Sequence, residues 1–119
     1  MKLLIVDDDE AMVHMLEKFF KIKGYDCTIS FDGKNALDIM SRKKFDTILL
    51  DLAMPGFSGY DFIDDLEKTG KLHEQNIVVL TASSITSVQS DALLKRGIKS
   101  CLNKPVTAET LLHAISSLD

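Results

Sequence analysis

The chain has 119 residues and a formal net charge of −4, with 45% hydrophobic and 27% charged residues. This length supports one hydrophobic core, and we expect a single domain over residues 1–119. The acidic balance argues against nucleic acid as a direct partner, because binding to phosphates requires a basic face. No apolar run approaches a membrane span, and the first residues lead into a strand without a signal-peptide pattern, so we expect a cytoplasmic protein.

Five short apolar segments alternate along the chain with five segments of helical character. The predicted strands cover residues 2–6, 26–31, 46–51, 76–81 and 98–102. The predicted helices cover residues 10–23, 34–43, 58–69, 88–96 and 107–118. In the first helix, one face is apolar and consists of Met12, Val13, Leu16, Phe19 and Phe20.

The patterning within these segments separates buried strands from an exposed one. The middle parts of segments 46–51 and 76–81 are continuously apolar, as in a parallel sheet covered on both faces. Segment 26–31 alternates apolar and polar residues, which indicates an edge strand with one exposed side. Ser58, with Asp61 three residues later, has the capping-box pattern that starts a helix.

This alternation predicts an α/β fold, (βα)5, with a doubly wound parallel five-stranded sheet of the flavodoxin-like type and strand order 2-1-3-4-5. In that order, a ligand site lies outside the carboxyl ends of strands 1 and 3. Strand 1 leads into Asp7 and Asp8, and strand 3 ends at Asp51. Cys27 and Cys101 would lie on opposite edges, about 19 Å apart, which is too far for a disulfide.

The acids at these strand ends predict a specific chemistry. Asp7, Asp8 and Asp51 would repel one another, and without a cation at least one would be protonated at neutral pH. Mg²⁺ resolves the conflict, because it binds one or two carboxylates together with waters and phosphate oxygens. Asp51 could then attack phosphorus as a nucleophile while the cation screens the incoming charge. Thr81 ends strand 4 and offers a hydroxyl to a phosphoryl group, and Lys104 follows strand 5 and offers an ammonium.

Four blocks of sequence carry a close resemblance to a known family. They are Leu4-Ile5-Val6-Asp7-Asp8, Leu49-Leu50-Asp51-Leu52-Ala53-Met54-Pro55 with Gly59, Thr81-Ala82, and Lys104-Pro105. In this order and at this spacing, they resemble the receiver domain of two-component response regulators, including the single-domain chemotaxis type. The resemblance covers essentially the whole chain, with no output domain expected.

The resemblance implies a role for each of these residues. Asp51 would be the phosphorylated residue, with Thr81 moving toward the phosphoryl group and Lys104 pairing with it. The resemblance also implies a cis Lys104–Pro105 bond. The Mg²⁺ ligands would be Asp8, Asp51 and the main-chain carbonyl of Ala53, with Asp7 acting mainly through water. Asp9 would lie outside this set.

The same resemblance implies partners. The phosphoryl donor would be the phosphohistidine of a sensor histidine kinase or phosphotransfer protein. A downstream protein would bind the face made by the fourth helix, fifth strand and fifth helix, and the chain would be a monomer or weak dimer. Such a domain catalyses only its own phosphorylation and dephosphorylation and is not an enzyme with separate substrates.

This sequence departs from the family pattern at several positions. Cys101 stands where Tyr or Phe is common, three residues before the lysine. In the family, that aromatic side chain changes rotamer together with the threonine, and a thiol is too small to replace the ring in this movement. Coupling to the output face should therefore be altered. Val106 stands where Phe is common. Ala53 and Ser83, two residues beyond the acceptor and the threonine, bring no strong acid or base, so we expect neither side chain to accelerate dephosphorylation.

Three alternatives remain open from the sequence. A haloacid-dehalogenase-type phosphatase also starts with a strand followed by Asp-x-Asp, a spacing that Asp7-Asp8-Asp9 satisfies. It would leave the block from Asp51 to Pro55 unexplained. A receiver-like interaction module that works without phosphorylation draws its support from Cys101. A flavin-binding module is disfavoured because three acids after strand 1 would repel its phosphate.

Overall fold

The structure is a computed structural model that describes residues 1–82 and 85–118. Its centre is a parallel five-stranded sheet with the order β2-β1-β3-β4-β5, which confirms the predicted flavodoxin-like α/β fold. The strands are β1 (Lys2–Val6), β2 (Asp26–Ser30), β3 (Thr47–Asp51), β4 (Ile77–Thr81) and β5 (Ser100–Asn103). The α-helices are α1 (Glu10–Ile22), α2 (Gly33–Met40), α3 (Gly59–Lys68), α4 (Ser87–Arg96) and α5 (Ala108–Ser116).

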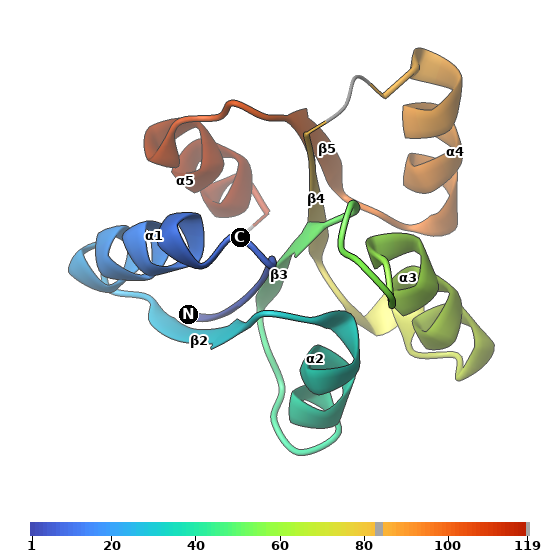
Figure 1. Ribbon diagram of the computed structural model, residues 1–119, viewed down its shortest axis with the longest axis horizontal. Coiled ribbons are helices and arrows are strands. Elements are labelled where there is room, and N and C mark those ends of the chain that lie inside the picture. Colours follow the sequence, from blue (N-terminus) through green and yellow to red (C-terminus); the bar gives the residue numbers. More distant parts are fainter. Residues whose placement is uncertain (83–84, 119) are drawn as a thin grey trace.

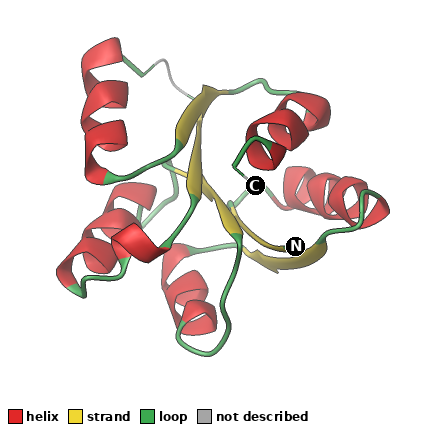
Figure 2. Cartoon of the chain, turned by 180° about the vertical axis from the view of Figure 1, so that it is seen from behind, coloured by secondary structure: helices red, strands yellow, loops and turns green. Residues whose placement is uncertain are grey.

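The helices form a layer on each face of the sheet. Figures 1 and 2 show α1 and α5 on one face and α2, α3 and α4 on the other. Alternate residues of the central strands point into these two layers, so that Leu3 and Ile5 of β1 pack with α1 and α5 while Leu4 and Val6 pack with the other helices. All five residues of β3 and all five of β4 are buried, as the apolar runs predict.

Each α-helix begins at a polar residue whose side chain accepts a hydrogen bond from the first helical turn. These capping residues are Asp9, Asp32, Ser58, Thr86 and Thr107. The predicted capping box is present, since Ser58 accepts from the amide of Asp61 and the Asp61 carboxylate accepts from the amide of Ser58. These caps fix where the loops at the carboxyl ends of the strands stop and the helices begin.

The edge strand β2 differs in detail from its period-two prediction. Ser30 is buried, and its hydroxyl donates to the carbonyl of Asp32 and accepts from the side-chain amide of Asn35. Phe31 lies just beyond the strand and is 36% exposed, with its ring edge-to-face against His14. The alternation therefore fails at the end of the strand, where the start of α2 covers Ser30 instead.

Two further boundaries differ from the sequence prediction. A short 3-10 helix, η1 (Leu72–Glu74), buries Leu72 between α3 and β4 and was not predicted. Strand β5 covers residues 100–103 rather than 98–102, because Ile98 is buried in the turn after α4, where its amide bonds the carbonyl of Leu93. Cys27 and Cys101 lie on the two edge strands and are both free thiols. Within the described residues, no helix has the length and hydrophobicity of a membrane span.

Candidate functional site

The register of the sheet brings the predicted acids to one place. Val6 pairs with Leu50, so Asp7 and Asp51 are the next residues along two neighbouring strands. Asp51 in turn lies beside Leu80, which directly precedes Thr81 on β4. Thr81 pairs with Asn103, after which the chain reaches Lys104. The residues chosen from strand ends in the sequence therefore share one rim of the sheet.

Lys104 connects the two buried acids. Its ammonium donates a hydrogen bond to the Asp7 carboxylate at 2.8 Å and lies 3.6 Å from Oδ1 of Asp51. Asp7 and Asp51 are 1% and 3% exposed, whereas the Lys104 side chain is 18% exposed. The backbone supports this arrangement, since the amide of Lys104 donates to the carbonyl of Thr81 at 2.8 Å.

Burial and mutual repulsion set the proton affinity of these groups. Burial and the charge of Asp7 raise the pKa of the Asp51 carboxyl from 3.8 to about 6, against the opposing effects of Lys104 and the Ala53 amide. Burial alone would lower the pKa of Lys104, but its hydrogen bond to Asp7 and the charges of Asp7, Asp51 and Asp9 raise it overall. The expected repulsion between the acids is therefore present at Asp51, and the positive charge of Lys104 offsets part of it.

The carboxylates of Asp7, Asp8 and Asp51 converge on a common volume. One oxygen from each lies within 4.8 Å of the others, close enough for a single metal ion. Asp8 is exposed, whereas the other two are buried, so the cluster opens to solvent on the Asp8 side. Hard carboxylate oxygens that repel one another when unoccupied suit a hard divalent cation.

The loop between β3 and α3 passes directly over Asp51. The amide of Ala53 donates to Oδ1 of Asp51 at 3.3 Å, and the amide of Gly59 donates to the carbonyl of Leu52 at 3.0 Å. A Cβ at Gly59 would lie 2.5 Å from the Asp51 carbonyl oxygen and 2.6 Å from the Cα of Leu52. The first residue of α3 must therefore be glycine for the helix to seat against the backbone of Asp51.

The remaining predicted residues take these positions. Thr81 is buried, with 5% exposure, at the end of β4. The Lys104–Pro105 peptide bond is cis, as the resemblance implies. Cys101 is half-buried in β5; burial raises the pKa of its thiol, and a hydrogen bond with the Ser90 side chain of α4 acts in the opposite direction. Ser83, expected to influence dephosphorylation, lies outside the described residues.

Asp9 has a role that the sequence interpretation missed. Its carboxylate accepts from the amide of Met12 at 3.2 Å and caps α1, and its own amide donates to Oδ1 of Asp7 at 3.0 Å. An aspartate immediately before the helical pattern is a known start signal, and it was available in the sequence. Asp9 thus orients Asp7 through the backbone while its side chain serves the helix.

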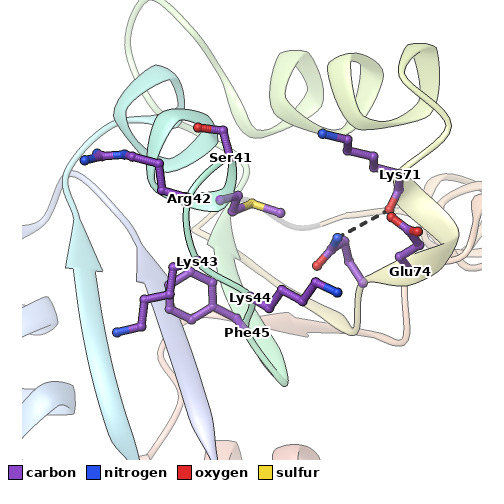
Figure 3. Close-up of a pocket in the computed structure, with 9 residues that line it drawn as sticks. Ser41, Arg42, Lys43, Lys44, Phe45, Lys71 and Glu74 are labelled. Atoms are coloured by element: carbon purple, nitrogen blue, oxygen red, sulfur yellow. Dashed lines mark hydrogen bonds between the residues drawn. The ribbon is translucent and has the colours of Figure 1, made fainter.

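A separate hollow of about 420 Å³ lies between the loop 41–45, which leads into β3, and residues 71–75, which precede β4 (Figure 3). Both segments lie at the amino ends of strands, so the hollow is at the opposite end of the sheet from the acids. Several lysines line it, but Arg42 pairs with Asp38 and Lys43 donates to the Thr28 hydroxyl. Arg42 and Lys43 are therefore engaged by residues outside the hollow, and the position of the hollow separates it from Asp51.

Comparisons with known proteins agree with this geometry. The response regulator receiver domain family matches residues 3–116. Response regulator MprA of Mycobacterium avium (strain 104) is 34% identical over 118 residues, which are 99% of this chain and 50% of that protein. The chain thus spans about half the length of the curated relatives it matches first.

Solved structures give the same result. The Vibrio cholerae chemotaxis protein CheY4 superposes with a TM-score of 0.88 and 26% identity, over 99% of this chain and 98% of that one. A response regulator from Burkholderia pseudomallei, solved with a phosphorylated aspartic acid, a calcium ion and citrate, superposes with a TM-score of 0.82 and 26% identity over 96% and 65% of the chains. A match across nearly the whole chain, with the acidic cluster at the expected rim, shows that the chain belongs to the response regulator receiver domain family.

Proposed function

We propose that Asp51 is the phosphoacceptor of this receiver domain and that its phosphorylation switches a protein-binding face. The observation that carries the proposal is the setting of Asp51. It is a buried carboxylate at the end of a buried strand, with a lysine nitrogen 3.6 Å away and the carboxylates of Asp7 and Asp8 beside it. A phosphoryl group there would meet the positive charge of Lys104 at the mouth of the site.

The donor in this proposal is the phosphohistidine of a sensor histidine kinase or of a phosphotransfer protein. A histidine kinase partner is what membership of the family implies. A carboxylate oxygen of Asp51 forms the new bond to phosphorus while the nitrogen–phosphorus bond of the phosphohistidine breaks. The bond electrons stay on the leaving imidazole, which takes up a proton, and the phosphoryl group is then an acyl phosphate on Asp51.

The side chains of this chain prepare that transfer. Asp51 must be ionised to attack, and its pKa of about 6 leaves it mostly ionised at neutral pH. The Ala53 amide holds Oδ1 of Asp51 and thereby orients the carboxylate. Lys104 would exchange its bond to Asp7 for a phosphoryl oxygen, and the hydroxyl of Thr81 would offer a second donor from the end of β4.

The cluster of Asp7, Asp8 and Asp51 fits a divalent cation, as receiver domains typically bind one. We propose Mg²⁺, held by Asp8, Asp51 and the Ala53 carbonyl, with Asp7 acting through water. When bound, Mg²⁺ would offset the negative charge brought by the phosphoryl group. The calcium ion and phosphorylated aspartic acid of the Burkholderia pseudomallei relative support this assignment.

We also propose that the downstream protein binds a face formed by α4, β5 and α5. The partner-binding face would include these elements, with Cys101 in β5 contacting Ser90 of α4 where the family commonly has an aromatic ring. The chain covers about half of the first curated relatives, so a single-domain role for this protein is also a proposal. The cytoplasmic location and the monomer or weak dimer expected from the sequence stay predictions.

The proposal is tested by intact mass spectrometry after incubation with a small phosphodonor and MgCl2. Wild type should gain one phosphoryl group, Asp51→Asn none, and wild type in EDTA none. A folded wild type that stays unmodified with several donors would overturn the proposal in favour of the phosphorylation-independent interaction module.

A further inference from the structure

The loop that covers Asp51 rests on the start of α2. Phe57 belongs to this loop and is half-buried against the core cluster under α2 and α3. Gly33, the first residue of α2, lies directly beneath its ring. A Cβ on Gly33 would lie 2.7 Å from Cδ2 of Phe57, 3.2 Å from Cε2 and 3.4 Å from the Phe57 carbonyl oxygen. The ring thus occupies the space that any other residue at position 33 would need.

The same segment of chain also supports the other side of the acidic cluster. Ser30 precedes Gly33 by three residues, and its carbonyl accepts a hydrogen bond from the amide of Asp7 at 3.1 Å. The Asp32 side chain caps α2 by accepting from Asn35 at 2.7 Å, which fixes the chain between these two points. The side-chain nitrogen of Lys34, the next residue, lies 5.9 Å from the centre of the Phe57 ring. The connection from β2 to α2 therefore contacts Asp7 through Ser30 and the loop that covers Asp51 through Gly33.

We propose that Gly33 and Phe57 are positioning residues for the phosphoryl and metal site. The packing of Phe57 on Gly33 holds the loop in the position that lets the Ala53 amide donate to Asp51. This inference rests on the proposed function, because it assigns the two residues to the site that Asp51 forms. Neither residue touches the reacting atoms, and both act through the position of the loop.

The chemistry of position 33 separates this role from simple helix formation. Gly33 has no positive φ angle, and alanine is the better helix former. On helix propensity alone, Gly33→Ala should therefore be favourable. The unfavourable term is the contact with Phe57, so any loss of function in this variant reports the packing of the loop.

The experiment measures the dissociation constant for MgCl2 by calorimetric titration of wild type, Gly33→Ala, Phe57→Ala and the double variant. Each variant is also unfolded in urea without Mg²⁺, which separates site geometry from stability. Gly33→Ala should weaken Mg²⁺ binding about tenfold, the size of effect seen when groups that orient metal ligands are altered. Lys34→Ala, the matched control at the neighbouring position, should stay within about twofold of wild type.

The double variant supplies the decisive comparison. With the ring removed, the added methyl meets no obstacle, so Gly33→Ala/Phe57→Ala should bind Mg²⁺ no more weakly than Phe57→Ala alone. Losses that multiply in the double variant would contradict the proposal. So would Gly33→Ala and Phe57→Ala variants that lower urea stability while Mg²⁺ affinity stays within twofold.

The result distinguishes this inference from the proposed function. If wild type binds no Mg²⁺, the metal assignment fails and the positioning role fails with it. If wild type binds Mg²⁺ and Gly33→Ala binds it equally well, only the positioning role is overturned. Should Gly33→Ala not fold, Phe57→Ala decides, because loss of the ring should itself weaken Mg²⁺ binding in a folded chain.

Discussion

The Lys104 ammonium donates a hydrogen bond to Asp7, at 2.8 Å, and not to Asp51, whose nearest oxygen is 3.6 Å away. The two residues are 97 positions apart in the chain and meet because β1 and β5 both end at this rim. The lysine thus neutralises the acid that is 1% exposed and leaves Asp51 with a weaker partner. Because Lys104 is hydrogen-bonded to Asp7, the Asp51 carboxylate is left available to attack a phosphoryl group.

The first prediction concerns this ion pair. Lys104→Met keeps the aliphatic stem but leaves Asp7 buried without its cation, and it should lower the free energy of unfolding by about 3 kcal/mol without Mg²⁺. Urea unfolding measures this loss. The exposed Lys44→Met should change it by less than about 0.5 kcal/mol. Adding Asp7→Asn to Lys104→Met should recover part of the loss, and a double variant less stable than either single variant would contradict the pairing.

The second prediction concerns the pH dependence of stability without metal. The pKa of Asp51 rises from 3.8 to about 6 in the folded state, so the folded chain binds more protons than the unfolded chain between these values. Stability from this group is therefore highest below about pH 4 and falls as the pH rises toward 7.

Asp51→Asn removes this term. The stability of Asp51→Asn relative to wild type should increase between pH 4 and pH 7, by at most about 3 kcal/mol, because one pKa unit corresponds to about 1.4 kcal/mol. Urea unfolding of both proteins across this range in EDTA measures the difference. A constant difference at all pH values would show that Asp51 has an ordinary proton affinity in the fold.

A third prediction concerns Gly59 at the start of α3. Gly59→Ala should lower the free energy of unfolding by about 2–3 kcal/mol, because its methyl would overlap backbone atoms of Asp51 and Leu52 that cannot rotate away. It should also slow phosphorylation of Asp51. The neighbouring Tyr60→Ala, whose side chain is 40% exposed, serves as the control and should cost less than 1 kcal/mol. Equal effects of the two substitutions would argue against this close approach.

A fourth prediction separates metal binding from folding at Asp8. This acid is exposed, so Asp8→Ala should leave stability in EDTA within about 0.5 kcal/mol of wild type. In wild type, MgCl2 at a hundred times its dissociation constant should add about 2.7 kcal/mol. Asp8→Ala should lose most of this gain, whereas the exposed Asp26→Ala should retain it. Retention of the full gain in Asp8→Ala would remove Asp8 from the ligand set.

Much of this site was predictable because its chemistry lies at strand ends. Strands 1, 3 and 4 are clearly apolar, and the strand order common to this alternation places Asp7, Asp51 and Thr81 at one rim, as the structure confirms. Lys104 followed from the same rule. The sequence interpretation assigned it only to the phosphoryl group, however, because the pairing with Asp7 depends on side-chain geometry across the width of the sheet.

What escaped prediction depends on local three-dimensional packing. Ser30 is polar yet buried, because Asn35 and Asp32 satisfy its hydroxyl after the chain turns. The contact of Gly33 with Phe57 joins the start of α2 to the loop between β3 and α3, and periodicity does not relate these two segments. By contrast, the N-cap role of Asp9 could have been recognised, and it was overlooked because the acidic run was considered only for its charge.

The measurement that tests the central claim most directly is tandem mass spectrometry of tryptic peptides after phosphorylation with a small phosphodonor and MgCl2. Asp51 lies in the peptide 45–68, whereas Asp7, Asp8 and Asp9 lie in the peptide 3–18. The proposed function predicts one phosphoryl group in peptide 45–68, localised to Asp51 and absent from Asp51→Asn. A phosphoryl group in peptide 3–18 would contradict it and would instead fit the phosphatase chemistry that Asp7-Asp8-Asp9 allows.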